Sequence, residues 1–370
     1  MIFSSLSPFL RSKFARTFTR DALLKMDPET AHQATIAALR FGLVSEKEQK
    51  PQPELKTEIC GLEFENPVGM AAGFDKNAQV PAVLGQIGFG FVEVGTLTPR
   101  PQSGNPKPRL FRLDKSEGVI NRMGFNNDGH QAAYGRLKGK HFPTIIGVNV
   151  GANKDSADFV ADYVAGIKRF ADVADYLTIN ISSPNTPGLR NLQSDEALKS
   201  LLGEVLAERS RASVRVPVFL KLAPDLDQLQ LDSIAKVILA TDLDGLIISN
   251  TTISREMVED RDHASEVGGL SGKPLFNLST TRLAQMRQRV GVDMPIIGVG
   301  GIHSLESAVA KFAAGANAIQ LYSALVFSGM ELLAEIKSGL VTAVHDGGHK
   351  NIASLTGTHV DDWASGKATL

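Results

Sequence analysis

The chain has 370 residues, a length that fits one large α/β barrel, and its 43% hydrophobic content can fill a sizeable core. Because 39 basic residues balance 40 acidic ones, no nucleic-acid partner is expected. The single cysteine, Cys60, excludes an internal disulfide, and the eight histidines show no ligand spacing, so no metal site is expected. No apolar run approaches the ~20 residues that span a bilayer.

Residues 1–44 are predicted to form a small helical hairpin. Each helix begins at a capping residue followed by proline, at Ser7-Pro8 and at Asp27-Pro28, and the second ends before Gly42. The first helix separates apolar from basic side chains: Leu10, Phe14 and Phe18 against Lys13, Arg16 and Arg20. This pattern is typical of a segment that lies on a membrane surface. The alternatives are a helix pair packed flat on the main domain and, for the first ~20 residues, a cleaved transit peptide.

Beyond a linker at residues 45–56, the sequence predicts a barrel domain over residues 57–345. Eight apolar or β-branched runs are candidate strands: 67–72, 90–96, 144–150, 176–182, 217–222, 244–250, 295–300 and 317–323. Helical stretches follow several of them: 157–174, 195–210, 227–241, 304–314 and 328–345. This alternation predicts an α/β fold, a (β/α)8 TIM barrel with a small N-terminal helical extension. A doubly wound open sheet is the alternative.

Three segments do not fit the alternation. The connections at 97–143 and 251–275 are too long for simple turns, so we interpret them as functional loops. Residues 346–370 are rich in Gly, Asp and Thr and show no apolar face. They are predicted to form a peripheral C-terminal tail.

Polar residues gather at the carboxyl ends of the predicted strands, where barrel enzymes carry their chemistry. The rim is rich in carboxamides, which are both donors and acceptors and so match the alternating N–H and C=O groups of a pyrimidine: Asn121, Asn149, Asn180, Asn185 and Asn250. Lys76 and Lys221 suit a substrate carboxylate or a reduced, anionic ring. The rim offers neither a His/Asp pair nor a carboxylate pair, which argues against hydrolysis.

A glycine run at residues 298–302 follows the seventh predicted strand, and Tyr322-Ser323 ends the eighth. Backbone N–H groups at these two places form the usual phosphate site of barrel enzymes. The phosphate belongs either to a substrate or to a cofactor such as FMN, and the motif does not distinguish the two.

These motifs resemble the dihydroorotate dehydrogenase family. The resemblance spans about 260 residues and rests on eight segments, of which the fourth-strand segment NISSPNTPGL is the most specific: 67–76, 121–127, 178–189, 221–225, 249–252, 268–272, 298–302 and 320–325. The family is a (β/α)8 barrel that holds FMN and oxidises dihydroorotate to orotate in pyrimidine biosynthesis. The resemblance therefore implies one non-covalently bound FMN per chain.

The resemblance also implies which residues bind each ligand. The residues implied for FMN are Ala72, Gly73, Lys76, Thr96, Asn149, Asn180, Lys221, Ser249, Gly272, Gly301, Tyr322 and Ser323. Those implied for the substrate are Lys76, Asn121, Arg122, Met123, Gly124, Phe125, Asn180, Asn185, Asn250 and Thr251. Lys221 would stabilise the charge of the reduced flavin. Ser249 stands where relatives often have threonine, and both residues offer a hydroxyl.

Two features match the quinone-linked class of this family. The soluble classes use a cysteine as base after the fourth strand, whereas Ser183 stands at that position here and Cys60 lies before the first strand. The quinone-linked class also has an N-terminal helical extension, which residues 1–44 resemble, notably at residues 26–32. Its quinone site would comprise His32, Arg112 and Tyr322.

The class implies a peripheral membrane protein on the cytoplasmic side of the bacterial inner membrane, with the mitochondrial inner membrane as alternative. A monomer is favoured. One rival interpretation is another FMN-dependent barrel that oxidises dihydropyrimidines with a soluble acceptor. Another is a non-catalytic phosphate-binding barrel, which a yellow, FMN-containing preparation would exclude.

Overall fold

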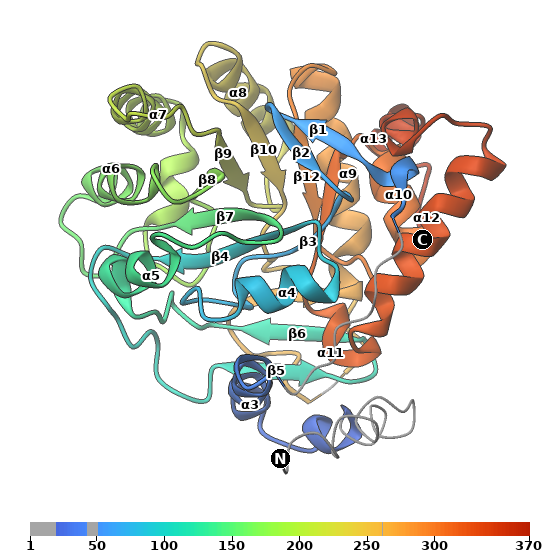
Figure 1. Ribbon diagram of the computed structural model, residues 1–370, viewed down its shortest axis with the longest axis horizontal. Helices are drawn as coiled ribbons and strands as arrows, with labels where there is room; N and C mark the ends of the chain where they lie inside the picture. Colours follow the sequence, from blue (N-terminus) through green and yellow to red (C-terminus); the bar gives the residue numbers. More distant parts are fainter. Residues whose placement is uncertain (1–19, 43–50, 261) are drawn as a thin grey trace.

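The computed structural model describes residues 20–42, 51–260 and 262–370 (Figure 1). Eight parallel strands close into a barrel in the order β10-β12-β13-β3-β4-β7-β8-β9. Their bounds are β3 (Val68–Met70), β4 (Phe91–Leu97), β7 (Ile145–Val150), β8 (Tyr176–Asn180), β9 (Val218–Leu222), β10 (Gly245–Ile248), β12 (Ile296–Val299) and β13 (Ala318–Leu321). All eight coincide with predicted strands. The predicted (β/α)8 barrel is confirmed, and closure of the sheet excludes the doubly wound alternative.

Helices separate successive barrel strands and surround the barrel (Figure 1). They are α4 (Pro81–Ile87), α5 (Gly129–Leu137), α6 (Phe159–Phe170), α7 (Asp195–Arg209), α8 (Gln228–Leu239), α9 (Phe276–Val290), α10 (Leu305–Ala313), α11 (Ala324–Ser328) and α12 (Glu331–Asp346). Several begin at a side-chain cap that binds the free N–H groups of the first turn. Asp227 accepts from Gln230 N at 2.8 Å and Ser304 from Ser307 N at 3.3 Å, each within a reciprocal capping box.

One end of the barrel is closed by aromatic rings at the amino ends of the strands. Phe91, Tyr176 and Phe219 are buried there, with the Tyr176 and Phe219 ring centroids 5.3 Å apart. A hairpin of β1 (Thr57–Ile59) and β2 (Leu62–Phe64) covers these rings, and Phe64 meets Phe91 at 5.3 Å. Strand glycines make room for them, since a Cβ at Gly147 would lie 2.0 Å from the Tyr176 ring. A ligand can therefore enter only from the opposite end.

A second sheet, which the sequence did not predict, forms from the two long connections. β5 (Leu110–Leu113), β6 (Gly118–Asn121) and β11 (Gly269–Gly272) pair antiparallel in the order β11-β6-β5. Because β11 lies about 150 residues beyond β6, no local sequence pattern predicts that the two strands pair. The connections interpreted as loops are thus ordered by a small apolar core of their own: Phe111, Leu113, Ile120 and Leu270.

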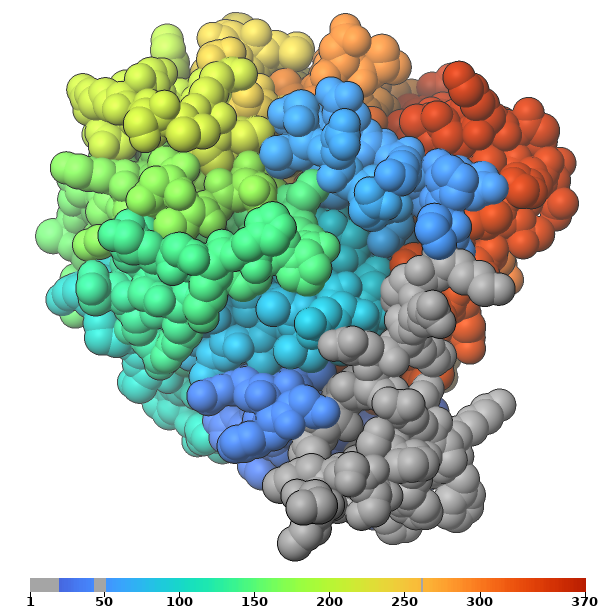
Figure 2. Space-filling view, in the orientation of Figure 1, coloured from blue at the N-terminus to red at the C-terminus, as the bar shows by residue number. Residues whose placement is uncertain are grey.

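The N-terminal helix α3 (Pro28–Arg40) packs against β5 at the edge of the molecule (Figures 1 and 2). The start predicted at Asp27-Pro28 is confirmed, since the Asp27 carboxylate accepts from Thr30 N at 2.9 Å. The first predicted helix, with Leu10, Phe14 and Phe18, lies outside the described residues. None of the helices in the described ranges combines the length and apolar character needed to cross a bilayer.

The prediction that residues 346–370 lack an apolar face is wrong. η4 (Ile352–Leu355) and α13 (Val360–Ala364) bury Ile352, Leu355 and Trp363 against the barrel helices. Trp363 packs edge-on against Phe276 of α9, with ring centroids 5.8 Å apart. Three apolar residues at irregular spacing match neither a helical nor a strand period, which is why the sequence alone did not reveal them.

We expect Trp363→Ala to destabilise the protein by about 3–5 kcal/mol, because the substitution removes a large buried ring and leaves a cavity beside Phe276. Leu229→Ala is the control, since Leu229 is 79% exposed and its loss is expected to cost less than about 0.5 kcal/mol. Urea unfolding of both variants measures the difference. Equal midpoints would show that the C-terminal segment contributes nothing to the barrel.

Candidate active site

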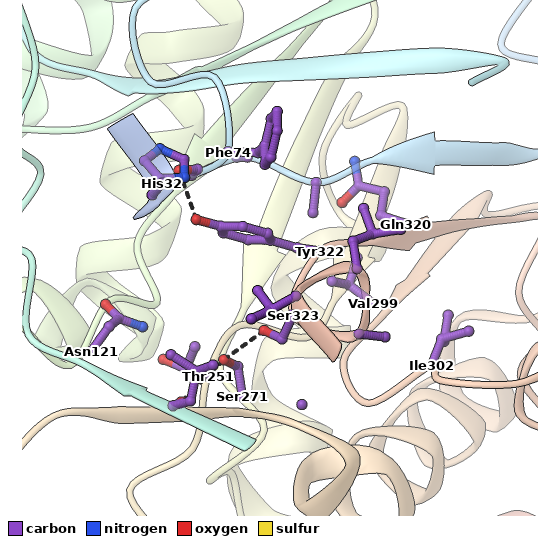
Figure 3. A pocket seen from close by; sticks show the side chains of 18 of the residues that line it. His32, Phe74, Asn121, Thr251, Ser271, Val299, Ile302, Gln320, Tyr322 and Ser323 are labelled. Carbon is purple, nitrogen blue, oxygen red and sulfur yellow. Dashed lines mark hydrogen bonds between the residues drawn. The ribbon is translucent and has the colours of Figure 1, made fainter. Parts of the chain in front are cut away.

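A cavity of about 940 Å³ opens at the carboxyl ends of the barrel strands and continues to the inner face of α3. Its size is at the upper end of the range for ligand sites. Of all the site residues predicted from the sequence, only Arg122 and Asn149 do not line it. Figure 3 shows part of the lining, with Asn121 and Thr251 across the cavity from His32 and Phe74.

The two exceptions lie nearby in different settings. The Arg122 side chain turns away and pairs with Glu266 at 2.6 Å, its guanidinium 4.6 Å from the Phe111 ring centroid. Asn149 is fully buried one layer beneath the cavity, where its Oδ1 accepts from Thr96 Oγ1 at 2.6 Å. Arg122 thus supports the β5–β6 sheet, and Asn149 supports the cavity floor.

A directed chain of hydrogen bonds crosses this floor. Asn250 Nδ2 donates to Asn180 Oδ1 at 3.1 Å, and Asn180 Nδ2 donates to Thr96 Oγ1 at 2.9 Å. Thr96 Oγ1 donates to Asn149, whose Nδ2 donates to Glu93 Oε1 at 2.7 Å. Each amide can present either N–H or C=O groups, so the chain fixes which one each presents to a ligand.

Glu93 ends the chain, and the sequence analysis missed it. Its carboxylate is inaccessible to solvent, and its Oε2 accepts from Tyr176 OH at 3.0 Å and from Gln320 Nε2 at 2.8 Å. Lys221 Nζ lies 3.9 Å from Oε1. Burial lowers the pKa of Lys221, and the Glu93 charge opposes that shift. A lone glutamate inside an apolar barrel strand was the available signal.

Ser183 lies three residues beyond β8 and is buried at 6% exposure. Its Oγ accepts from Asn185 N at 3.2 Å, and Asn185 Nδ2 donates to Asn121 Oδ1 at 3.3 Å. These contacts join the loop after β8 to β6 of the second sheet. The buried Thr186 Oγ1 has no hydrogen-bond partner among the described residues, so it is free to bind a water or a ligand.

Lys76 lines the cavity just after β3. Burial lowers the pKa of its ammonium group to about 8 and the charge of Arg109 adds to this, while Glu29 and Asp75 act in the opposite direction. Asp75 is buried and holds the loop by accepting from Gln79 N and Val80 N, each at 2.8 Å. A bound anion would favour the charged form of Lys76.

Three aromatic rings connect α3 to the barrel mouth (Figure 3). The rings of His32 of α3, Phe74 and Tyr322 contact one another pairwise, with centroid distances of 5.5 Å for His32–Phe74, 5.8 Å for Phe74–Tyr322 and 6.4 Å for His32–Tyr322. Burial lowers the pKa of His32 to about 3, so its imidazole is neutral at physiological pH. Arg112 of β5 donates to the carbonyls of Leu23 and Met26, which anchors the segment before α3.

A buried ion pair fixes α3 to the connection after β4. Arg109 donates to both carboxylate oxygens of Glu29, at 2.7 and 3.0 Å, and also to the carbonyls of Ser103 and Asn105. Asn105 N in turn donates to Met123 O at 3.0 Å in the cavity wall. The sequence analysis did not single out Glu29 or Arg109, because their pairing depends on contact between distant segments.

A sequence model described as "Dihydroorotate dehydrogenase" matches residues 54–344. The chain belongs to the dihydroorotate dehydrogenase family. A relative from Rhizobium johnstonii named "Dihydroorotate dehydrogenase (quinone)" is 54% identical over 95% of this chain and 98% of its own length. One with the same name from Sinorhizobium medicae is 56% identical over 93% and 96%.

Solved structures agree with this assignment. The dihydroorotate dehydrogenase of Eimeria tenella, solved in complex with ferulenol, superimposes with a TM-score of 0.86 and 38% identity over 92% of this chain and 98% of its own. Its ligand-free form also gives a TM-score of 0.86, at 38% identity. The family is flavin-dependent.

A double-mutant cycle tests the Glu93–Lys221 pair. Glu93→Gln and Lys221→Met each leave a buried charge unpaired, so each is expected to destabilise the protein by about 3–5 kcal/mol. Because the double variant removes both charges, its loss of unfolding free energy should be smaller than the sum of the two single losses by about 0.5–3 kcal/mol. Lys221→Met combined with Arg287→Met is the control, since these two cations share no partner and their effects should add. Urea unfolding that gives strict additivity for Glu93 and Lys221 would rule out coupling.

Proposed function

We propose that this protein oxidises dihydroorotate to orotate with FMN and passes the electrons to a membrane quinone. The observation that carries the proposal is one continuous cavity. It joins the amide-rich barrel mouth around Ser183 to the apolar inner face of the N-terminal segment at Leu23 and Leu24. The names of the bacterial relatives give the same substrate and class of acceptor.

The residues present fit FMN. Gly73 takes a positive φ and lies against the Tyr322 ring, where a Cβ would approach to 3.3 Å. The space for a flat ring at this position therefore depends on glycine having no side chain. The buried Gln320 Oε1 has no partner among the described residues and can accept from a ring N–H. Gly301 and Ser323 would hold the phosphate. When bound, FMN supplies the acceptor for the hydride and the route for electrons to the quinone.

The protein's own residues handle the substrate and its proton. The carboxamides of Asn121, Asn180, Asn185 and Asn250 hold the pyrimidine ring, and Lys76 holds the substrate carboxylate. Ser183 Oγ takes a proton from the ring carbon next to the C4 carbonyl, while the adjacent C6 loses hydride. A serine hydroxyl is a weak base, so its own proton must leave, through a water at Thr186 and Phe125.

The N-terminal segment is the proposed route for quinone. His32, Arg112 and Tyr322 would contact the quinone head, with Tyr322 between that pocket and FMN. Residues 1–44 would hold the protein on the membrane surface through apolar and basic side chains, which gives reversible attachment. We place the protein on the cytoplasmic face of the bacterial inner membrane, with the mitochondrial inner membrane as alternative, and as a monomer.

Ser183→Ala is expected to slow reduction of bound FMN by dihydroorotate about 100- to 10,000-fold, because it removes the base and little volume. FMN should remain bound. In the unaltered protein, reduction should accelerate as pH rises, since a hydroxyl base must lose its proton. Stopped-flow absorbance measures both effects. Ser194→Ala is the control, being an exposed serine in the same β8–α7 connection, and the assignment fails if both variants reduce FMN at the same rate.

His32→Ala and Arg112→Ala are expected to spare reduction of FMN by dihydroorotate but to lower kcat/KM for quinone about 10- to 100-fold each, as the loss of a hydrogen bond to a polar ligand would. Arg40→Ala, an exposed residue of the same helix, should change neither. Fumarate and NAD should not replace the quinone. Unaltered quinone turnover in both variants, or efficient turnover with a soluble acceptor, would favour the rival class.

A further inference from the structure

Lys311 of α10 is a completely buried lysine that no step of the proposed mechanism uses. Its Nζ lies 2.8 Å from Ser279 Oγ, 2.7 Å from Thr280 Oγ1 and 3.1 Å from Gly300 O. The Phe276 ring centroid lies 4.8 Å away. These four residues come from the start of α9 and from the glycine run after β12. Lys311 therefore supports the predicted phosphate site from behind.

The hydrogen-bond pattern around this amine fits an ammonium group. The Ser279 hydroxyl hydrogen is engaged by Phe276 O at 3.0 Å or Gly300 O at 2.8 Å, and the Thr280 hydroxyl hydrogen by Phe276 O at 2.7 Å. Both hydroxyl oxygens thus accept from Lys311, as does the Gly300 carbonyl. Three acceptors require three N–H groups, which an ammonium has and a neutral amine lacks.

The charge lacks a counter-ion within the protein. Burial lowers the pKa of the Lys311 ammonium group well below the usual value, and no carboxylate of the described residues opposes this shift. A buried, unpaired cation is costly unless an anion lies close by. The nearest part of the cavity is lined by Gly300 and Gly301, where an anion can bind.

Peptide geometry links Lys311 to that position. The peptide between Gly300 and Gly301 is trans, so its C=O and N–H point in opposite directions. Because the Gly300 carbonyl points to Lys311, the Gly301 N–H points away from it, toward the cavity. This N–H has no acceptor among the described residues. A Cβ at Gly301 would lie 2.4 Å from Phe276 Cα, so the loop is pressed against α9 and cannot easily turn over.

We propose that Lys311 is a positioning residue for the cofactor phosphate, which it orders through the Gly300–Gly301 peptide and neutralises from behind. The inference rests on the proposed FMN cofactor. Its consequence is selectivity: the buried charge strengthens binding of a flavin that carries a phosphate and leaves binding of the ring system unaffected. Lys311 acts through the backbone and touches neither substrate nor the reacting atoms.

The test compares FMN with riboflavin. Starting from the flavin-loaded protein, the flavin is released and the affinities of FMN and riboflavin are measured by quenching of flavin fluorescence. Lys311→Met should weaken FMN binding about 10- to 100-fold, because it removes the charge behind the phosphate and the donor to the Gly300 carbonyl, and it should change riboflavin binding less than about threefold. Equal weakening of the two flavins, or of neither, would overturn the proposal.

Two further variants keep the result interpretable. The double variant Lys311→Met, Thr280→Val also removes the Thr280 hydroxyl, which would otherwise lose its hydrogen-bond donor. If Lys311→Met alone does not fold, the ratio of FMN to riboflavin affinity is measured in the double variant instead. Arg287→Met is the matched control, because Arg287 is another buried cation that binds backbone carbonyls, including Gly315 O at 2.6 Å. It should lower the unfolding midpoint without changing the ratio of the two affinities.

The affinities of the unaltered protein for FMN and riboflavin distinguish a failure of the Lys311 proposal from a failure of the FMN assignment. A strong preference for FMN over riboflavin that Lys311→Met retains overturns only the role of Lys311. No preference in the unaltered protein overturns the FMN assignment and the Lys311 proposal with it.

Discussion

The site depends on one carboxylate at the centre of the barrel. Glu93 can only accept hydrogen bonds when ionised, and it accepts them from Asn149, Tyr176 and Gln320. That fixed polarity passes through Asn149 and Thr96 to the amides of the cavity floor, and its charge keeps the buried Lys221 paired. A pyrimidine is recognised by its pattern of donors and acceptors, so under the proposed function this carboxylate would set the selectivity of the floor.

A second constraint acts from outside the barrel. Glu29 and Arg109 join α3 to the connection that also supports the cavity wall, and Arg112 holds the segment before α3. The small β11-β6-β5 sheet links the two regions, because Arg112 on β5 binds the segment before α3 and Asn121 on β6 lines the cavity. The proposed substrate and quinone ends of one cavity therefore share a single support, although they come from opposite parts of the sequence.

Much of the site was accessible from the sequence because a closed parallel barrel has only one edge where all strand ends meet. Once eight strands were predicted, the polar residues that follow them had to converge, and nearly all of them line the cavity. Arg122 is instructive, since its neighbours line the wall while its own side chain faces the surface and pairs with Glu266. A motif identifies a segment, but the direction of each side chain within it depends on packing.

The sequence by itself determined the eight barrel strands and the start of α3 at Asp27, because these follow from a local period or cap. The residues of the rim followed from their places at the strand ends and from the family resemblance. The tertiary structure alone decided the pairing of β6 with β11, the burial of Trp363, and the partners of Glu93 and Lys311. These features join residues far apart in the chain. Their energies come from burial and from paired charges, which exist only after the chain has closed around them.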